Sequence, residues 1–149
     1  MKRLLPLLLL TLLPCGELAA QSAIGMNAQA VPITATSVPA KSANAPRVIV
    51  LGGMSGDKAG MQLVRNATED YANSADNQLD VLFVAAANPD GAPLLFPPNE
   101  PAYATNWTAW SLWRWLQSEA PDVIVIAGND DYELGSALAR DTKIGRAHV

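Results

Sequence analysis

The segment at residues 46–91 constrains the fold most, because two short apolar runs flank a helical pattern there. The first run, residues 48–51, is bounded by Pro46 and Gly52, and the second occupies residues 79–86. Continuous apolar runs of this length are typical of strands buried on both faces. A strand, a helix and a strand in that order favour a right-handed parallel crossover. We therefore expect an α/β fold with an open, mostly parallel sheet and flanking helices.

The helical pattern between the two runs extends from Asp57 to about Ala72, and Asp57 is suited to cap its N-terminus. Apolar residues recur in it at spacings of three and four, which predicts one buried stripe. The stripe consists of Met61, Val64, Ala67 and Tyr71.

A second helix is predicted at residues 107–119, with Asn106 as its cap and a third buried strand, residues 123–127, after it. We expect most of the four tryptophans in this region to be core, with Trp110, Trp113 and Leu116 along one side of the helix. A proline-rich loop at residues 93–101 precedes this helix, and the start of another helix is predicted at residues 132–140.

The N-terminal residues 1–20 read as a signal peptide, with a basic start, an apolar run at residues 4–13 and small residues for cleavage. The run is too short to span a bilayer comfortably, so no membrane span is expected. We predict an exported protein, either periplasmic or secreted. Cys15 leaves open a lipoprotein with a lipid anchor at that residue.

The rest of the chain divides into three parts by composition. Residues 21–45 are rich in Ala, Ser, Pro and Thr and are predicted to form a flexible linker. Residues 46–143 are expected to be a partial α/β domain. Residues 144–149 look like a translated sequencing adapter, so we expect a non-native tail on an N-terminal fragment of a longer protein.

Charge and cysteine content exclude several classes of function. The chain carries 10 Lys+Arg against 14 Asp+Glu, a net charge of −4, which argues against binding nucleic acid or anionic lipid. Cys15 is the single cysteine, so no intramolecular disulfide can staple the domain. Stability must come from a buried core.

In open α/β sheets, ligands bind beyond the carboxyl ends of the strands. Three loops are expected there, at residues 52–58, 88–92 and 128–131. The first of them reads Gly-Met-Ser-Gly-Asp-Lys at residues 53–58, and the second reads Asn-Pro-Asp-Gly at residues 88–91.

This order of motifs resembles the zinc carboxypeptidase family, including its succinylglutamate desuccinylase and aspartoacylase group. That family opens with a strand, Gly-x-His-Gly-Asp/Asn-Glu, a helix, and a strand leading into Asn-Pro-Asp-Gly. Residues 112–116 and 121–123 are similar to the helix and strand that lead to its last zinc histidine. The resemblance covers about residues 47–131 and implies a carboxypeptidase-like fold. It also implies zinc-dependent hydrolysis of a peptide or acyl-amino-acid amide.

The departures from the family pattern fall on the metal ligands. Ser55 stands where the first zinc histidine belongs, Lys58 replaces the glutamate ligand, and Asn129 follows the last strand where a histidine is expected. A hydroxyl is a poor zinc donor and an ammonium group repels the ion. The sole histidine, His148, lies in the suspect tail. We therefore predict no zinc site in this fragment, although the resemblance implies zinc.

The catalytic residues stay unknown, and the predicted substrate-binding residues at the entrance are Ser55, Asp57, Asn88 and Asp90. Two functions remain open: a divergent hydrolase, and a non-catalytic module, or pseudoenzyme, that binds a peptide or cell-wall glycan. Asn88 to Gly91 can equally be a plain tight turn that binds nothing.

Three further chemistries are weaker alternatives. Carboxylates at Asp57, Asp90, Asp130 and Asp131 would suit calcium or magnesium, but acidic residues at turns are ordinarily caps. A serine hydrolase would use Ser55 as nucleophile, yet the second glycine of the motif is one place early and no native histidine supplies the base. Phosphate binding at the first glycine turn is disfavoured because Asp57 would repel the anion.

Overall fold

The computed structural model describes residues 19–99, 106–129, 131–141 and 145–148, and every structural statement below concerns these ranges. The predicted signal peptide up to residue 18, including Cys15, and the candidate ligand Asp130 lie outside the described residues. The elements follow in the order β1 (Ala20–Met26), β2 (Pro32–Val38), β3 (Arg47–Gly52), α1 (Lys58–Ala72), β4 (Asp80–Val84), α2 (Trp107–Glu119), β5 (Val123–Ala127), α3 (Leu134–Asp141) and β6 (Gly145–His148).

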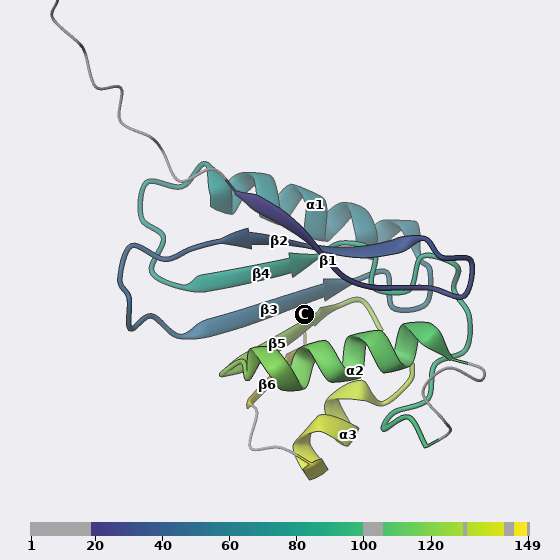
Figure 1. Ribbon diagram of the computed structural model, residues 1–149. Helices are drawn as coiled ribbons and strands as arrows, with labels where there is room; N and C mark the ends of the chain where they lie inside the picture. The colour runs from purple at the N-terminus through teal and green to yellow at the C-terminus, as the bar shows by residue number, and fades with distance from the viewer. Residues whose placement is uncertain (1–18, 100–105, 130, 142–144, 149) are drawn as a thin grey trace, which may run out of the picture.

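The strands form one six-stranded sheet in the order β1-β2-β4-β3-β5-β6 (Figure 1). The central strand β3 pairs in parallel with β4 on one side and β5 on the other, with Val48 opposite both Val81 and Val123. This parallel centre confirms the α/β fold that the apolar runs predicted. The sheet as a whole is mixed, because β1 and β2 join it antiparallel.

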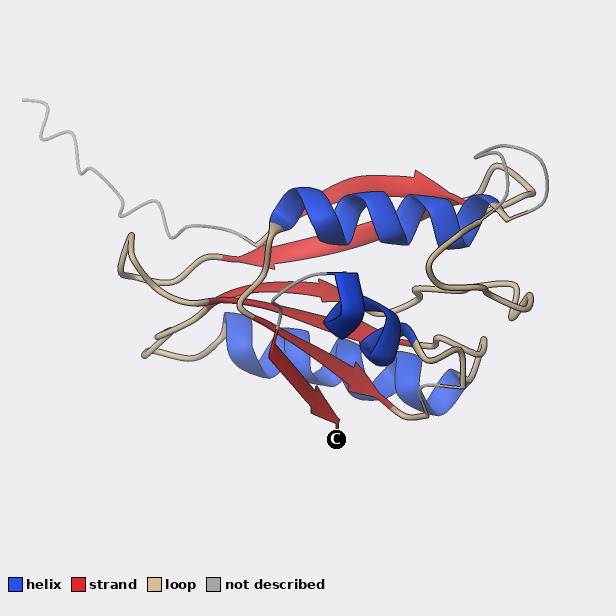
Figure 2. Ribbon diagram, turned by 90° about the horizontal axis from the view of Figure 1, so that it is seen from below, coloured by secondary structure: helices blue, strands red, loops and turns tan. Residues whose placement is uncertain are grey.

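Helices cover both faces of the sheet, with α1 on one face and α2 and α3 on the other (Figures 1 and 2). The side chains of β3 alternate between the two layers: Ile49 and Leu51 pack in the core beneath α2 and α3, and Val50 packs beneath α1. A strand buried on both faces needs apolar residues at consecutive positions, which explains the uninterrupted run at residues 48–51.

The prediction of a flexible linker at residues 21–45 is wrong. This segment contains most of β1 and all of β2, an antiparallel hairpin whose second strand pairs with β4. Ile33 and Ala35 are 1% and 2% exposed, while Thr34 and Thr36 alternate with them on the other face. Buried and more exposed side chains thus alternate along β2, but the polar composition of the segment hides this alternation. An edge hairpin needs few large apolar residues to achieve it.

Helix α1 begins and ends as predicted, with Asp57 as its N-cap. Val64 is buried, and Ala67 and Tyr71 pack partly buried around it, as the predicted stripe requires. In α2 the Asn106 cap is also confirmed, because its side chain accepts a hydrogen bond from Ala109 N.

The buried face of α2 differs from the predicted one. Trp113 and Leu116 are buried, but Trp110 is only half-buried, and the face is completed by Thr108, Ala109 and Leu112. The proline-rich loop has no regular structure in residues 93–99, yet it enters the core. Its Phe96 is 6% exposed and stacks on Trp113 with ring centroids 6.1 Å apart.

Part of the predicted non-native tail is strand β6, which pairs in parallel with β5 at register Val123 to Gly145. Its origin stays a prediction. None of the helices in the described ranges has both the length and the apolar character needed to cross a bilayer.

Candidate functional site at the carboxyl edge of the sheet

The turn that follows β3 is shaped by glycines. Gly53 and Gly56 have φ values of 63° and 74°, in the left-handed region that side chains with a Cβ avoid. Gly56 N donates a hydrogen bond to Gly53 O at 3.1 Å, which closes the turn just before α1 begins. The chain thus reverses sharply at the carboxyl end of the central strand.

The loop after β4 lies directly against this turn. Asn88 N donates to Gly53 O at 3.2 Å, and a Cβ placed on Gly56 would lie only 2.8 Å from Gly91 Cα. Gly91 N donates to Asn88 O at 3.1 Å, so Asn-Pro-Asp-Gly forms the tight turn that its residues favour. The structure therefore brings the first two predicted site loops together.

Asn88 holds these loops in place from the inside. Its side chain is fully buried, and Nδ2 donates hydrogen bonds to Met54 O at 2.7 Å and Ala92 O at 2.8 Å. Its Oδ1 accepts no hydrogen bond from a described residue. In this position Asn88 positions the loops from within and does not face solvent at the entrance.

Asp57 links the first loop to the first turn of α1, and this turn lies against the end of β5. Its Oδ1 accepts from Gly60 N at 2.5 Å, and its Oδ2 accepts from Ser55 Oγ at 3.4 Å. A Cβ on Gly60 would lie 2.9 Å from Ala127 O, so α1 can approach β5 this closely only because residue 60 is glycine. A glycine inside a helix pattern was the sequence signal for this contact, and sequence reasoning missed it.

The remaining predicted residues are more exposed. Ser55 is half-buried and contacts Asp57, whereas Asp90 and Lys58 are exposed at the rim. The structure therefore joins Ser55 to Asp57 by a hydrogen bond, encloses Asn88 within the loops, and leaves Asp90 on the surface.

The donor set at this edge does not fit a catalytic zinc ion, which needs three protein ligands and an open position. Within the described ranges, no three His, Cys, Asp or Glu side chains are grouped so that they could share a metal ion. For the same reason, Asp57, Asp90 and Asp131 do not form the carboxylate site considered for calcium or magnesium. The phosphate alternative also fails, because the Asp57 carboxylate itself occupies the N-terminus of α1.

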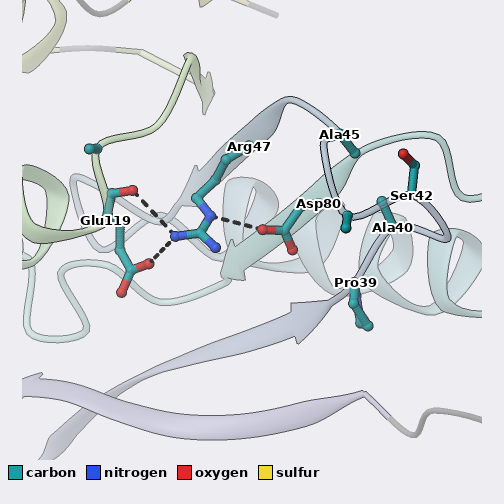
Figure 3. Close-up of a pocket in the computed structure, with 9 residues that line it drawn as sticks. Pro39, Ala40, Ser42, Ala45, Arg47, Asp80 and Glu119 are labelled. Carbon is teal, nitrogen blue, oxygen red and sulfur yellow. Dashed lines mark hydrogen bonds and ion pairs between the residues drawn. The ribbon is translucent and has the colours of Figure 1, made fainter.

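A hollow of about 410 Å³ lies at the opposite, amino end of the parallel strands (Figure 3). Arg47 Nε donates to Asp80 Oδ2 at 2.8 Å, and Arg47 Nη1 pairs with Glu119 Oε2 at 3.0 Å (Figure 3). The hydrogen bond with Asp80 raises the pKa of Arg47, although partial burial opposes this shift. One guanidinium thus bridges two carboxylates and ties the starts of β3 and β4 to the end of α2. We interpret these ion pairs as structural and the hollow as no ligand site, since ligands in such sheets bind at the other edge.

Comparison with known proteins identifies the fold. No family model and no curated protein matches the sequence. Among solved structures, a metallo-carboxypeptidase from Burkholderia cenocepacia is 14% identical with a TM-score of 0.60, over 78% of this chain and 38% of the other. A putative carboxypeptidase A from Shewanella denitrificans is 12% identical with a TM-score of 0.64, over 77% of this chain and 36% of the other.

An aspartoacylase family protein from Mesorhizobium loti is 15% identical with a TM-score of 0.53, over 74% of this chain and 40% of the other. The chain thus spans less than half the length of each of these proteins. The fold is carboxypeptidase-like, as the sequence motifs predicted, and at this level of identity the likeness establishes the fold alone.

Proposed function

We propose that this chain belongs to an exported domain of peptide- or acyl-amino-acid-hydrolase ancestry that recognises such a ligand at the carboxyl edge of its sheet without zinc-dependent hydrolysis. The proposal rests on the contacts of Asp57. Its carboxylate caps α1 and accepts a hydrogen bond from the Ser55 hydroxyl instead of facing an open site. The basic and apolar residues at the start of the chain support export.

The neighbouring residues support binding over metal catalysis. Lys58 places an exposed ammonium group in the first turn of α1, where it would repel a divalent cation. The same ammonium is suited to pair with the carboxylate of a peptide end or an acyl-amino acid. Ser55 lies half-buried in the same turn, and its hydroxyl, which donates its proton to Asp57, can still accept a hydrogen bond from an N–H group of the ligand.

A second candidate function is a hydrolase whose metal ligands lie beyond the described residues. The likeness to metallo-carboxypeptidases supports it, because the chain covers only 36% to 38% of the two carboxypeptidases described above. That function requires stoichiometric zinc and an amidase activity that a chelator abolishes. A serine hydrolase is less supported, because Ser55 Oγ contacts a carboxylate that already caps a helix.

Metal content separates the two candidates. Atomic absorption of the purified full-length protein, and its calorimetric titration with zinc chloride, are expected to show no stoichiometric zinc. Chelation is expected to leave its melting temperature unchanged. One tightly bound zinc per molecule, together with an amidase activity that a chelator abolishes, would overturn the proposal and support the hydrolase.

A gain-of-function variant tests the physical reason directly. The double variant Ser55→His and Lys58→Glu introduces an imidazole and a carboxylate. It should raise the zinc affinity at least about tenfold, since two of the three zinc ligands of the resembled family are then present. The matched control combines Ser118→His and Arg65→Glu, which lie on α2 and α1 on opposite faces of the sheet. Equal zinc affinity of both double variants would show that the edge is no remnant of a metal site.

A further inference from the structure

A groove of about 400 Å³ lies between the edge strand β1 and helix α2, on the sheet face that α2 covers. Its aromatic wall consists of Trp107, Trp110 and Trp115, and Arg114 lies among them. Gly25 and Met26 line it from β1. We call this feature the α2 groove. None of its lining residues belongs to the loops at the carboxyl edge of the sheet.

The α2 groove is fixed by a close contact between its two walls. A Cβ on Gly25 would overlap with Ser111 Cβ, so the strand and the helix can approach this closely only because residue 25 is glycine. Ser111 Oγ donates to Met26 O at 3.3 Å and accepts from Met26 N at 3.4 Å. Trp115 packs against the hydrophobic core from the helix side. The contact between strand and helix thus fixes the width of the groove.

The charge in the α2 groove is opposite to that of the chain. Arg114 is exposed, and the two ion pairs among the described residues both belong to Arg47, so Arg114 has no carboxylate partner there. None of the described residues that line the groove is acidic, while the whole chain has a net charge of −4. A lone guanidinium beside indole rings in an acidic protein is complementary to an anionic ligand with a flat apolar face.

We propose that the α2 groove binds a saccharide that carries a carboxylate. The apolar face of a sugar ring packs on indole, and the guanidinium fork matches a carboxylate with two parallel hydrogen bonds. The serine hydroxyls of the lining are already bonded to backbone, Ser111 to Met26 and Ser118 to Trp115 O. The carboxylate is therefore the polar group of the ligand that the groove is equipped to recognise. This site goes beyond the proposed function and holds whether or not the carboxyl edge binds a peptide.

A sugar fits the α2 groove better than a peptide strand does. A peptide would bind by adding to the free edge of β1, but the register of β1 shifts between Ala23 and Gly25 where it borders the groove. Such an irregularity interrupts the row of backbone groups that strand addition needs. Stacking on indole needs no continuous backbone edge.

The test compares two chemically matched probes on the intact chain: a hexamer of galacturonic acid and the same hexamer with its carboxylates methyl-esterified. The readouts are tryptophan fluorescence and calorimetry. All four tryptophans of the chain lie in α2, so binding should change the emission. We expect the acid to bind about tenfold more tightly than the ester, with an affinity that falls as salt rises.

The variant Arg114→Gln should abolish the preference for the acid while leaving the circular dichroism spectrum unchanged, since the side chain is exposed. Arg65→Gln removes an equally exposed charge from α1 and should leave the preference intact. Equal binding of acid and ester, an unchanged preference in Arg114→Gln, or no binding of either probe would overturn the proposal. Tighter binding of hexaglutamate than of the acidic sugar would also overturn it and indicate a peptide site.

Discussion

Replacing Asn88 tests whether a buried amide holds the two loops of the carboxyl edge together. Its Nδ2 makes both of the hydrogen bonds that it can donate, to Met54 O and Ala92 O, and Met54 is 1% exposed. The lost hydrogen bond to Ala92 O costs about 1 kcal/mol, and the buried Met54 carbonyl, left without this partner, costs about 1–3 kcal/mol. Asn88→Ala should therefore lower the free energy of unfolding by about 2–4 kcal/mol. That is a large share of the roughly 5–15 kcal/mol typical of a domain.

Asn88→Asp gives a sharper result because its effect depends on pH. Burial against two carbonyl oxygens raises the pKa of the introduced carboxyl above the value of about 3.9 for an unfolded chain. The protonated form is favoured by folding and can still donate one hydrogen bond. The variant should therefore be most stable below about pH 4 and lose stability as pH rises toward its folded pKa, by up to about 1.4 kcal/mol per pH unit.

Urea denaturation followed by circular dichroism at several pH values between 4 and 7 measures both effects. Asn106→Asp is the matched control. Its Oδ1 caps α2 by accepting from Ala109 N, a role that Asp fills equally well. Its Nδ2 also donates to Pro93 O, but this bond is exposed, so the stability of Asn106→Asp should change by less than about 1 kcal/mol. The reasoning is refuted if Asn88→Ala matches the parent chain within about 1 kcal/mol, or if Asn88→Asp shows no loss of stability relative to Asn106→Asp between pH 4 and 7.

Three further substitutions test individual contacts by thermal and urea denaturation. Asp57→Ala should lower the free energy of unfolding by about 1 kcal/mol because Gly60 N loses its partner, whereas Asp57→Asn should cost only a few tenths; equal losses would contradict the capping role. Gly25→Ala should lower the free energy of unfolding by about 1–3 kcal/mol, because the added Cβ overlaps with Ser111. Adding Ser111→Gly should recover part of this loss; if the losses of the two single variants simply add in the double variant, the contact is not the cause. Arg47→Gln should cost at most about 1 kcal/mol, because the side chain is 42% exposed, and the loss should shrink in 1 M salt; a salt-independent loss would show that packing, not charge, is responsible.

Local sequence patterns were sufficient to predict the central strands and the helix caps of this molecule. The strands at β3, β4 and β5 could be read as apolar runs, and the caps Asp57 and Asn106 as polar residues at helix starts. These features depend on residues a few positions apart, so a sequence alone contains them. The same holds for the tight turn at Asn88 to Gly91, whose residues set their own backbone conformation.

The hairpin of β1 and β2 was not recognised from the sequence. Its residues are small and polar, and it becomes ordered because β4 supplies the neighbouring backbone and α2 covers Ile33 and Ala35. Pairing of this kind depends on segments more than forty residues away in the chain. Composition alone therefore indicated a linker where the tertiary structure has a strand pair.

At the candidate site, the residue types identified the loops, but only their packing assigned roles. The sequence predicted that Ser55, Asp57, Asn88 and Asp90 share one edge of the sheet, and the substituted zinc-ligand positions remain a prediction from the resemblance. In the structure, the Asn88 side chain lies inside the loops and Asp57 caps α1. The α2 groove lies between Gly25 and the tryptophans of α2. Burial, partners and close approach are properties of residues far apart in the chain, so they are decided when the layers pack together.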